Sequence, residues 1–205
     1  MRHVEFFFDC SSPWTYLAFH NIQPMARELG AEIVWRPILV GGVFNAVNDR
    51  VYRDRENPLP IKAAYMDKDL ADWARLAGLA IRWRPTIFPI NSVRAMRGCL
   101  AAEREGKLVE HARLVFEAYW RDDRDIAQDA VLREVAIGCG LDPDRYFAAI
   151  GSDEIKSTLR ANTDELIARG GFGSPTMFVN GADMYFGNDR LPLVRAALTR
   201  GLNHG

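Results

Sequence analysis

The spacing of apolar residues along this chain changes from one segment to the next, and each spacing predicts an element. Val4 to Phe8 is a nearly unbroken apolar run rich in aromatic residues, which predicts a strand buried on both faces. Apolar residues then recur at helical spacing as far as Leu29, and Gly30 is placed to cap the helix. Ile33 to Trp35 predicts a second strand. A strand, a helix and a strand in succession form a βαβ unit, and hence a parallel strand pair.

The segment from Gly41 to Pro60 has no clear period and is predicted to be a loop. It holds a glycine pair, three asparagines, two prolines and charges of alternating sign. Long loops in compact domains tend to be functional or mobile, and we expect the same of this one.

From about residue 62 to residue 169 the spacing is helical throughout, which predicts about six helices and no strand. Asp142 before Pro143 marks one helix start, because a capping side chain precedes a proline in the first turn. The last long helix ends at Gly170-Gly171.

The chain then returns to β character. Thr176 to Val179 predicts a strand, Asn180-Gly181 a two-residue hairpin turn, and Met184 to Phe186 the returning strand. The core face of a closing helix carries Leu191, Val194 and Leu198.

The order of elements predicts an α/β fold. Without the helical block the order is βαβ–ββα, which is that of a thioredoxin-like domain. We therefore predict a discontinuous thioredoxin-like domain formed by residues 1–60 and 170–205, with an inserted all-helical domain at 61–169.

Charge and hydropathy argue against two classes of partner, nucleic acids and membranes. The 205 residues carry a formal net charge of -1 and no basic stripe, which argues against nucleic acid because phosphate neutralisation needs clustered Lys and Arg. No apolar stretch approaches the roughly 20 residues that span a bilayer, and the start of the chain lacks a charged region followed by an apolar signal core. We expect a cytoplasmic protein with no membrane partner.

The cysteines predict neither a disulfide nor a metal site. Cys10, Cys99 and Cys139 lie far apart and have no metal-ligand spacing with the histidines at 3, 20, 111 and 204. We expect three buried, reduced thiols.

Ser12 stands at the N-cap position of the first predicted helix, with Pro13 at its first position. One interpretation is a helix cap and nothing more. The other uses the same geometry, since the unsatisfied N–H groups and the positive helix end favour an anion such as a thiolate. A hydroxyl there can donate to a ligand's sulfur and lower its pKa.

Two further motifs have equally plain alternatives. Ser174-Pro175 merely ends a glycine-rich loop, or it contains a cis peptide bond that turns the backbone of Ser174 outward to pair with a bound peptide. Asp189-Arg190 is a helix cap with a solvated neighbour, or it recognises a zwitterionic group.

Four stretches together resemble the 2-hydroxychromene-2-carboxylate isomerases, relatives of the kappa-class glutathione transferases and of the DsbA-type oxidoreductases. They are "FFFDCSSPWTYLA", "YMDKDLADWARLAGL", "GSPTMFVNG" and "YFGNDRL". The resemblance covers essentially the whole chain. It implies a thioredoxin-like domain with a helical insertion, bound glutathione as cofactor, usually a homodimer, and a small-molecule substrate from aromatic catabolism.

The resemblance also implies roles for single residues. Ser12 matches the catalytic serine that contacts the glutathione sulfur, and Pro13 and Trp14 complete its Ser-Pro-aromatic motif. The backbone of Ser174, before Pro175, would pair with the cysteinyl part of glutathione. The segment matching the one that holds the γ-glutamyl end comprises Gly187, Asn188, Asp189 and Arg190.

Three asparagines are weaker matches. Asn48 matches a loop asparagine that contacts glutathione, although Asn57 competes with it, and Asn91 in "FPINS" lies where the family places part of its organic-substrate pocket. We further expect the substrate carboxylate to meet Arg82, Arg84 or an arginine of the loop, although "IRWRP" is equally well a surface turn.

The chain departs from its redox relatives at one motif. Where they have a CxxC pair, this chain has Ser12 and Thr15, which excludes dithiol exchange by that route. Cys10 would share a strand face with Val4, Phe6 and Phe8, so we expect it to be buried and inert.

These features favour a glutathione-dependent cis-trans isomerase acting on 2-hydroxychromene-2-carboxylate or a similar intermediate. In it, a borrowed thiolate would be the nucleophile. The alternatives are a kappa-type transferase or peroxidase that consumes glutathione, and a non-catalytic glutathione-binding module.

Overall fold

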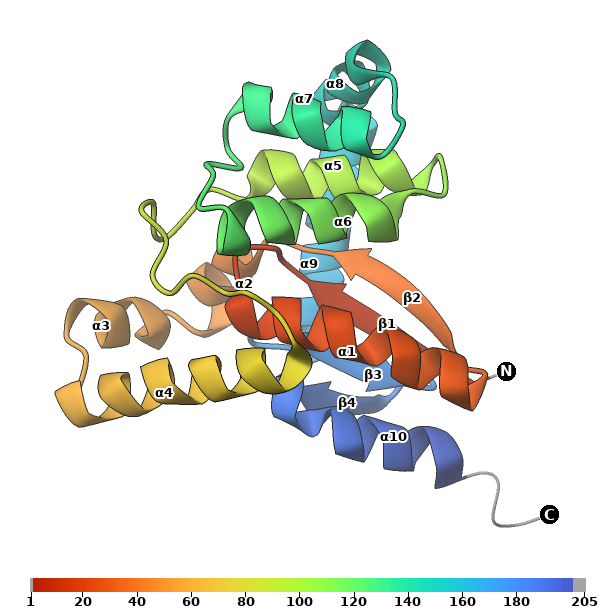
Figure 1. The fold of residues 1–205 in the computed structure, drawn as a ribbon. Helices are drawn as coiled ribbons and strands as arrows, with labels where there is room; N and C mark the ends of the chain where they lie inside the picture. The colour runs from red at the N-terminus through yellow and green to blue at the C-terminus, as the bar shows by residue number, and fades with distance from the viewer. Residues whose placement is uncertain (1, 201–205) are drawn as a thin grey trace.

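A four-stranded mixed sheet organises the structure, a computed structural model that describes residues 2–200 (Figure 1). The strands are β1 (His3–Phe8), β2 (Glu32–Pro37), β3 (Thr176–Val179) and β4 (Asp183–Phe186), in the order β2-β1-β3-β4. β1 pairs with β2 in parallel, as predicted, with Val4 opposite Ile33. β3 is antiparallel to both β1 and β4.

The apolar run of β1 is buried on both faces, as its sequence predicts. Val4, Phe6 and Phe8 join the larger core, and Cys10 joins the same cluster just beyond the strand. Phe7 points to the opposite face, where it packs in a smaller cluster with residues that include Phe178. The strand at the centre of the sheet therefore anchors two separate cores.

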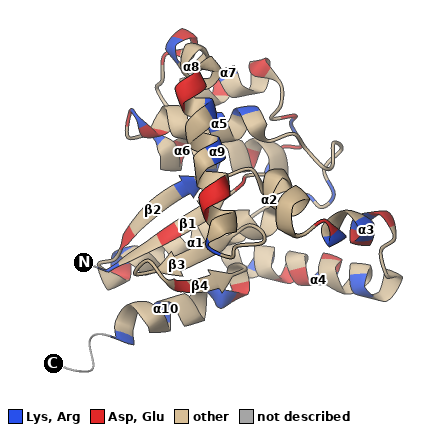
Figure 2. Ribbon diagram, turned by 180° about the vertical axis from the view of Figure 1, so that it is seen from behind, with Lys and Arg blue, Asp and Glu red and all other residues tan. Residues whose placement is uncertain are grey.

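Helices cover the two faces of the sheet. α1 (Pro13–Leu29) ends at Gly30, which adopts the predicted left-handed conformation with φ 59°. It packs against α10 (Leu191–Thr199) on one face. α9 (Asp153–Ala168) and α2 (Val40–Val47) lie on the other face, as the view from behind shows (Figure 2).

The helical block lies beyond one edge of the sheet and alongside α1 (Figure 1). Asp142 caps α8 by accepting a hydrogen bond from the N–H of Arg145 at 2.8 Å, as predicted. The helices of the block before α9 are α4 (Pro60–Ala77), α5 (Val93–Glu103), α6 (Leu108–Phe116), the π-helix η1 (Glu117–Arg121), α7 (Asp129–Gly138) and α8 (Pro143–Gly151).

The predicted fold class, a thioredoxin-like α/β domain with added helices, is confirmed, and the exact domain boundaries stay a prediction. Across residues 2–200, no helix combines the length and the apolar character needed to cross a membrane.

The prediction of a loop over 41–60 is wrong. This segment forms most of α2 and all of α3 (Arg50–Glu56) before α4 begins at Pro60. Gly42 allows a close approach of α2 to α9, because a Cβ at this position would lie 3.3 Å from a methyl group of Thr163. α3 has no buried residue, so it carries no apolar period for the sequence to reveal.

The hairpin turn is one residue longer than predicted. Val179 pairs with Asp183, so the loop contains Asn180, Gly181 and Ala182. Asn180 and Gly181 both have positive φ, 50° and 88°, as the Asn-Gly pair favours.

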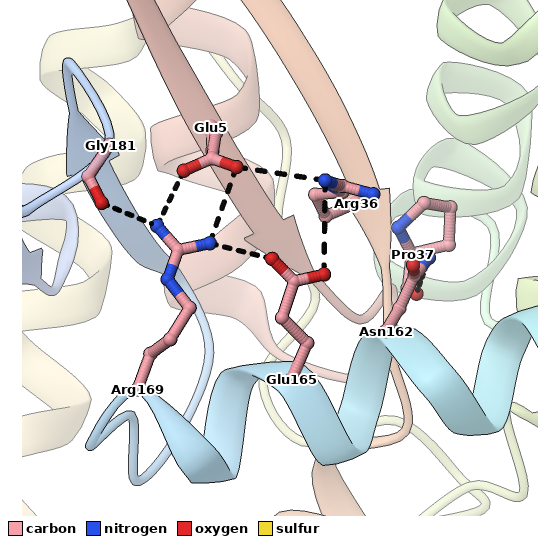
Figure 3. A network of polar contacts seen from close by, with 7 residues as sticks. All are labelled: Glu5, Arg36, Pro37, Asn162, Glu165, Arg169 and Gly181. Atoms are coloured by element: carbon pink, nitrogen blue, oxygen red, sulfur yellow. Dashed lines mark hydrogen bonds and ion pairs between the residues drawn. The ribbon is translucent and has the colours of Figure 1, made fainter.

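A charged network closes the face of the sheet that carries Phe7 (Figure 3). The Arg169 guanidinium donates to both carboxylate oxygens of Glu5, to Glu165 and to the carbonyl of Gly181. It also lies 3.8 Å from the ring centroid of Phe178. Arg36 of β2 pairs with Glu5 and Glu165 as well, at 3.7 and 3.8 Å, so the network joins β1, β2, α9 and the hairpin turn and gives Glu5 two cationic partners.

Candidate active site

Ser12 occupies the N-cap of α1, and its hydroxyl accepts one hydrogen bond there while its proton makes only a long contact. The oxygen accepts a hydrogen bond from the N–H of Thr15 at 3.2 Å. The hydroxyl proton points toward the carbonyl oxygen of Ser174 at 3.4 Å, which is a long contact. The predicted cap is therefore confirmed, and the proton remains available to a ligand at the helix N-terminus.

Ser174 lies directly against this helix start. The Ser174–Pro175 peptide bond is cis, as predicted. The Ser174 hydroxyl accepts a hydrogen bond from the N–H of Asp9 at 3.0 Å and lies 2.8 Å from the hydroxyl of Thr15. The two residues at the CxxC positions of redox relatives, Ser12 and Thr15, thus both contact Ser174.

Asp9, which the sequence analysis missed, lies beneath this site and is fully buried. One carboxylate oxygen accepts from the N–H of Ser11 at 2.9 Å. The other accepts from the N–H of Val40 and from the hydroxyl of Ser92, each at 2.9 Å. Burial raises the pKa of Asp9, while these hydrogen bonds act in the opposite direction. A polar residue directly after a buried strand was the signal available in the sequence.

A cavity of about 370 Å³ opens beside Ser11, the neighbour of Ser12. α2, α3 and the segment leading into α5 line it with mostly apolar groups, among them Phe44 and Phe88. Asn91 lines it, as the resemblance implied, and so do Ser92, Tyr52 and Arg55. The last two were hidden in the segment predicted to be a loop.

The segment matched to the γ-glutamyl end forms a tight turn before α10. Asn188 to Arg190 is a 3-10 turn, and Gly187 has φ 102°, which favours glycine. Asp189 pairs with Arg190, both are exposed, and neither side chain caps α10. The alternative of Asp189 as a helix cap is therefore wrong.

The Nδ2 group of Asn188 is buried and has no hydrogen-bond partner within residues 2–200. An unpaired buried donor costs free energy, which makes this turn a candidate binding surface.

The remaining candidates separate clearly. The Asn48 side chain donates to the carbonyl of Phe172 at 3.1 Å, which places it beside the loop that carries Ser174. Asn57 is an exposed residue at the end of α3. Arg82 pairs with Asp123, and Arg84 stacks on Trp83. Neither arginine lines the cavity, which fits the surface-turn interpretation of "IRWRP".

The three cysteines are buried and free, as predicted. Burial raises the pKa of the Cys10 thiol well above its usual range, and neighbouring Cys99 and Asp9 add to the effect. A thiol with a raised pKa is a poor nucleophile at neutral pH.

Comparison with known proteins assigns the family. Residues 3–199 match the DsbA-like thioredoxin domain. A 2-hydroxychromene-2-carboxylate isomerase of Pseudomonas putida is 30% identical over 199 residues, covering 96% of this chain and 94% of the relative. Glutathione S-transferase kappa 2 of Caenorhabditis elegans is 31% identical over 208 residues, covering 93% of this chain and 89% of the relative. A solved 2-hydroxychromene-2-carboxylate isomerase superposes with a TM-score of 0.84 at 28% identity, covering 98% of this chain and 96% of that chain.

The chain therefore belongs to the family of DsbA-like thioredoxin domains. Within that family its relatives include 2-hydroxychromene-2-carboxylate isomerases and kappa-class glutathione transferases. Both the resemblance stated from the sequence and the expectation of an enzyme of the isomerase class are confirmed.

Proposed function

We propose that this protein is a glutathione-dependent cis-trans isomerase of 2-hydroxychromene-2-carboxylate or a similar intermediate of aromatic catabolism. One observation carries the proposal: the hydroxyl of Ser12 caps α1, keeps a proton to donate, and lies at a site with no thiol nucleophile of its own. The relatives named for this isomerisation support the choice of substrate.

The residues present fit glutathione. Ser12 offers a donor to the sulfur, and the backbone of Ser174 would pair with the cysteinyl part. The γ-glutamyl end would meet the turn from Gly187 to Arg190, where the buried amide of Asn188 still needs an acceptor. Pro13 and Trp14 fix the start of α1, and Asn48 lies next to the Ser174 loop.

Glutathione, when bound, would supply a thiolate nucleophile able to add reversibly to an electrophilic carbon and so permit rotation about a double bond. The chain's own contribution is electrostatic. The Ser12 hydroxyl turns its proton from the Ser174 carbonyl toward the sulfur, and the N-terminus of α1 favours the negative charge. The mostly apolar cavity would hold the organic substrate and keep water away from the reacting carbon. Asn91 is one of the polar residues in its lining.

A kappa-type transferase or peroxidase is the second candidate, and the kappa-class relative supports it. The two activities share the site and differ in what happens to glutathione. Product formation with a small, fixed amount of glutathione separates them. We expect many turnovers of 2-hydroxychromene-2-carboxylate with the free thiol unchanged. Loss of thiol in proportion to product would establish the transferase or peroxidase instead.

A binding-only module, the third alternative, is tested by calorimetry. Glutathione affinity without turnover of any unsaturated ketoacid would favour it. Absence of glutathione affinity would overturn the whole proposal.

We also propose a cytoplasmic homodimer. Apolar side chains on α4 support the dimer, since Ile61 is 76% exposed and Leu76 79% exposed. Light scattering at micromolar concentration measures the mass directly, and a monomer would contradict this part of the proposal.

A further inference from the structure

The cavity beside Ser11 has a single charged side chain in its lining, that of Arg55. We propose that Arg55 binds the carboxylate of the organic substrate and selects planar unsaturated acids over their neutral analogues. The inference rests on the proposed function, because it concerns the second ligand of the same site.

Two aromatic rings hold the Arg55 guanidinium at the cavity. Its central carbon lies 5.5 Å from the ring centroid of Phe44 and 5.6 Å from that of Phe88. These stacking contacts leave the N–H groups at the edge of the guanidinium free. Planar edge donors match a carboxylate in a bidentate arrangement.

Arg55 differs from its neighbours on α3 in having no acidic partner. Arg50 pairs with Asp54, and Arg53 pairs with Asp49. Within residues 2–200, Arg55 forms no ion pair and no side-chain hydrogen bond. The side chain is exposed overall, but partial burial of the guanidinium lowers its pKa, and the group stays cationic at neutral pH. A cation with no acidic partner can bind an anionic ligand without breaking an existing ion pair.

The rest of the cavity suits an otherwise apolar ligand. The helix starts at its border, Val40 of α2 and Ser92 before α5, already bind the buried carboxylate of Asp9, so Arg55 supplies the positive charge of the lining. No Asp or Glu lines it. The apolar and aromatic lining suits an unsaturated ring system, and a volume of about 370 Å³ lies in the range of small-molecule sites.

α3 presents this chemistry from one face. Tyr52 and Arg55 are three residues apart on the helix, and both line the cavity. The Tyr52 hydroxyl donates to Asn45 at 2.8 Å, which ties α3 back to α2. One face of α3 therefore lines the cavity with Tyr52 and Arg55, and Arg55 carries the charge of that face.

The test compares acid and amide ligands on matched variants. Arg55→Gln removes the charge, and Arg53→Gln is the control on the same helix, where the arginine faces Asp49 and does not line the cavity. Calorimetry with chromone-2-carboxylate and chromone-2-carboxamide, with and without glutathione, measures the selectivity. Because α3 has no buried residue, both variants should fold as the wild type does.

We expect Arg55→Gln to weaken binding of the acid by about 10- to 100-fold, the size of a lost charge-assisted hydrogen bond, and to leave binding of the amide unchanged. The KM for a carboxylate substrate should rise in step, and Arg55→Lys should recover part of the loss. The Arg53→Gln control should match the wild type for both ligands.

Three results would overturn the inference. Equal loss of acid and amide binding would indicate a packing role, and no acid binding by the wild type would remove the ligand class. Weaker glutathione binding with intact acid selectivity would assign Arg55 to the glycyl carboxylate of glutathione. If the wild type binds the acid through Arg55 but turns over no substrate, the proposed isomerase activity fails while Arg55 keeps its role.

Discussion

Replacing Ser12 with alanine tests whether the capping hydroxyl also stabilises a thiolate. The substitution removes the bond from Thr15 N–H, a cap worth about 1 kcal/mol of protein stability. It also removes the one proton that the hydroxyl can donate to a bound sulfur. A hydrogen bond to a charged group contributes about 1.5 to 3 kcal/mol.

The second contribution converts directly into a pKa. Since one pKa unit corresponds to about 1.36 kcal/mol, the pKa of the bound glutathione thiol should rise by roughly 1 to 2 units in Ser12→Ala. The sign follows from the charge, because a donor that favours the thiolate lowers the thiol pKa and its loss raises it. The helix N-terminus remains, so the pKa should stay below that of free glutathione.

Ser152→Ala is the matched control. Ser152 caps α9 in the same manner, accepting from the N–H of Ile155 at 3.3 Å, and its hydroxyl donates to the carbonyl of Ala149. Ultraviolet titration of the thiolate in the glutathione complex measures the pKa, and thermal unfolding measures the loss of stability. Both variants should lose stability, and only Ser12→Ala should shift the thiol pKa. An unchanged pKa in Ser12→Ala, or an equal shift in both variants, would refute the reasoning.

Two further predictions concern stability. Arg169→Met should lower the free energy of unfolding by about 1 to 3 kcal/mol, because it removes both hydrogen bonds from Arg169 to the largely buried Glu5 and leaves the longer contact with Arg36 at 3.7 Å. Arg169 lowers the pKa of Glu5 below its usual 4.5, so the pair stabilises the fold above that pH and loses its effect as the pH falls through the lower folded value. Denaturant titrations between pH 3 and pH 7 should show this slope in the wild type, and an identical slope in the variant would contradict it. Gly98→Ala should lower the free energy of unfolding by about 1 to 3 kcal/mol in the same titrations, because the new Cβ would lie 2.1 Å from the Tyr146 hydroxyl and 2.8 Å from two ring atoms of His111.

Strands and long helices were predictable because their burial leaves a period in the sequence. β1 is buried on both faces and reads as an apolar run, and α1 keeps an apolar stripe between a serine cap and a glycine cap. The hairpin followed from Asn180-Gly181, with an error of one residue in the loop. These elements could be predicted because the residues within each of them determine its backbone conformation.

The prediction for residues 41–60 failed because burial leaves no clear period in this segment. The glycines of α2 weaken helix propensity, and the close approach that Gly42 allows is to α9, far away in sequence. α3 has no buried residue, and two exposed i,i+4 ion pairs lie along it. Such pairs contribute little to helix stability. The contact with α9 is not visible in a window of the sequence, and the i,i+4 charge pairs, although visible, are too weak to predict a helix alone.

The candidate site divides in the same way. Ser12, Ser174 and Asn91 lie in motifs that a short window reveals. The position of Arg55 could not be predicted without α3, and its contact with Phe88 arises only in the tertiary fold. The sequence left Arg82, Arg84 and the arginines of the loop as alternatives, and we propose Arg55 from its place in the cavity lining.

Asp9 explains how two halves of the site, each predicted separately, hold one geometry. Its backbone N–H binds the hydroxyl of Ser174, and its carboxylate binds the starts of α2 and α5 through Val40 and Ser92. All three donors to its side chain approach as N–H or O–H groups, so only a group that accepts at both oxygens satisfies them. A carboxylate does this, and the same bonds act against the rise in pKa that burial causes. The start of α1 at Ser12 and the cavity at α2 and α5 therefore share one anchor at the end of β1, and in the proposed reaction this anchor would set the spacing of glutathione and the organic substrate.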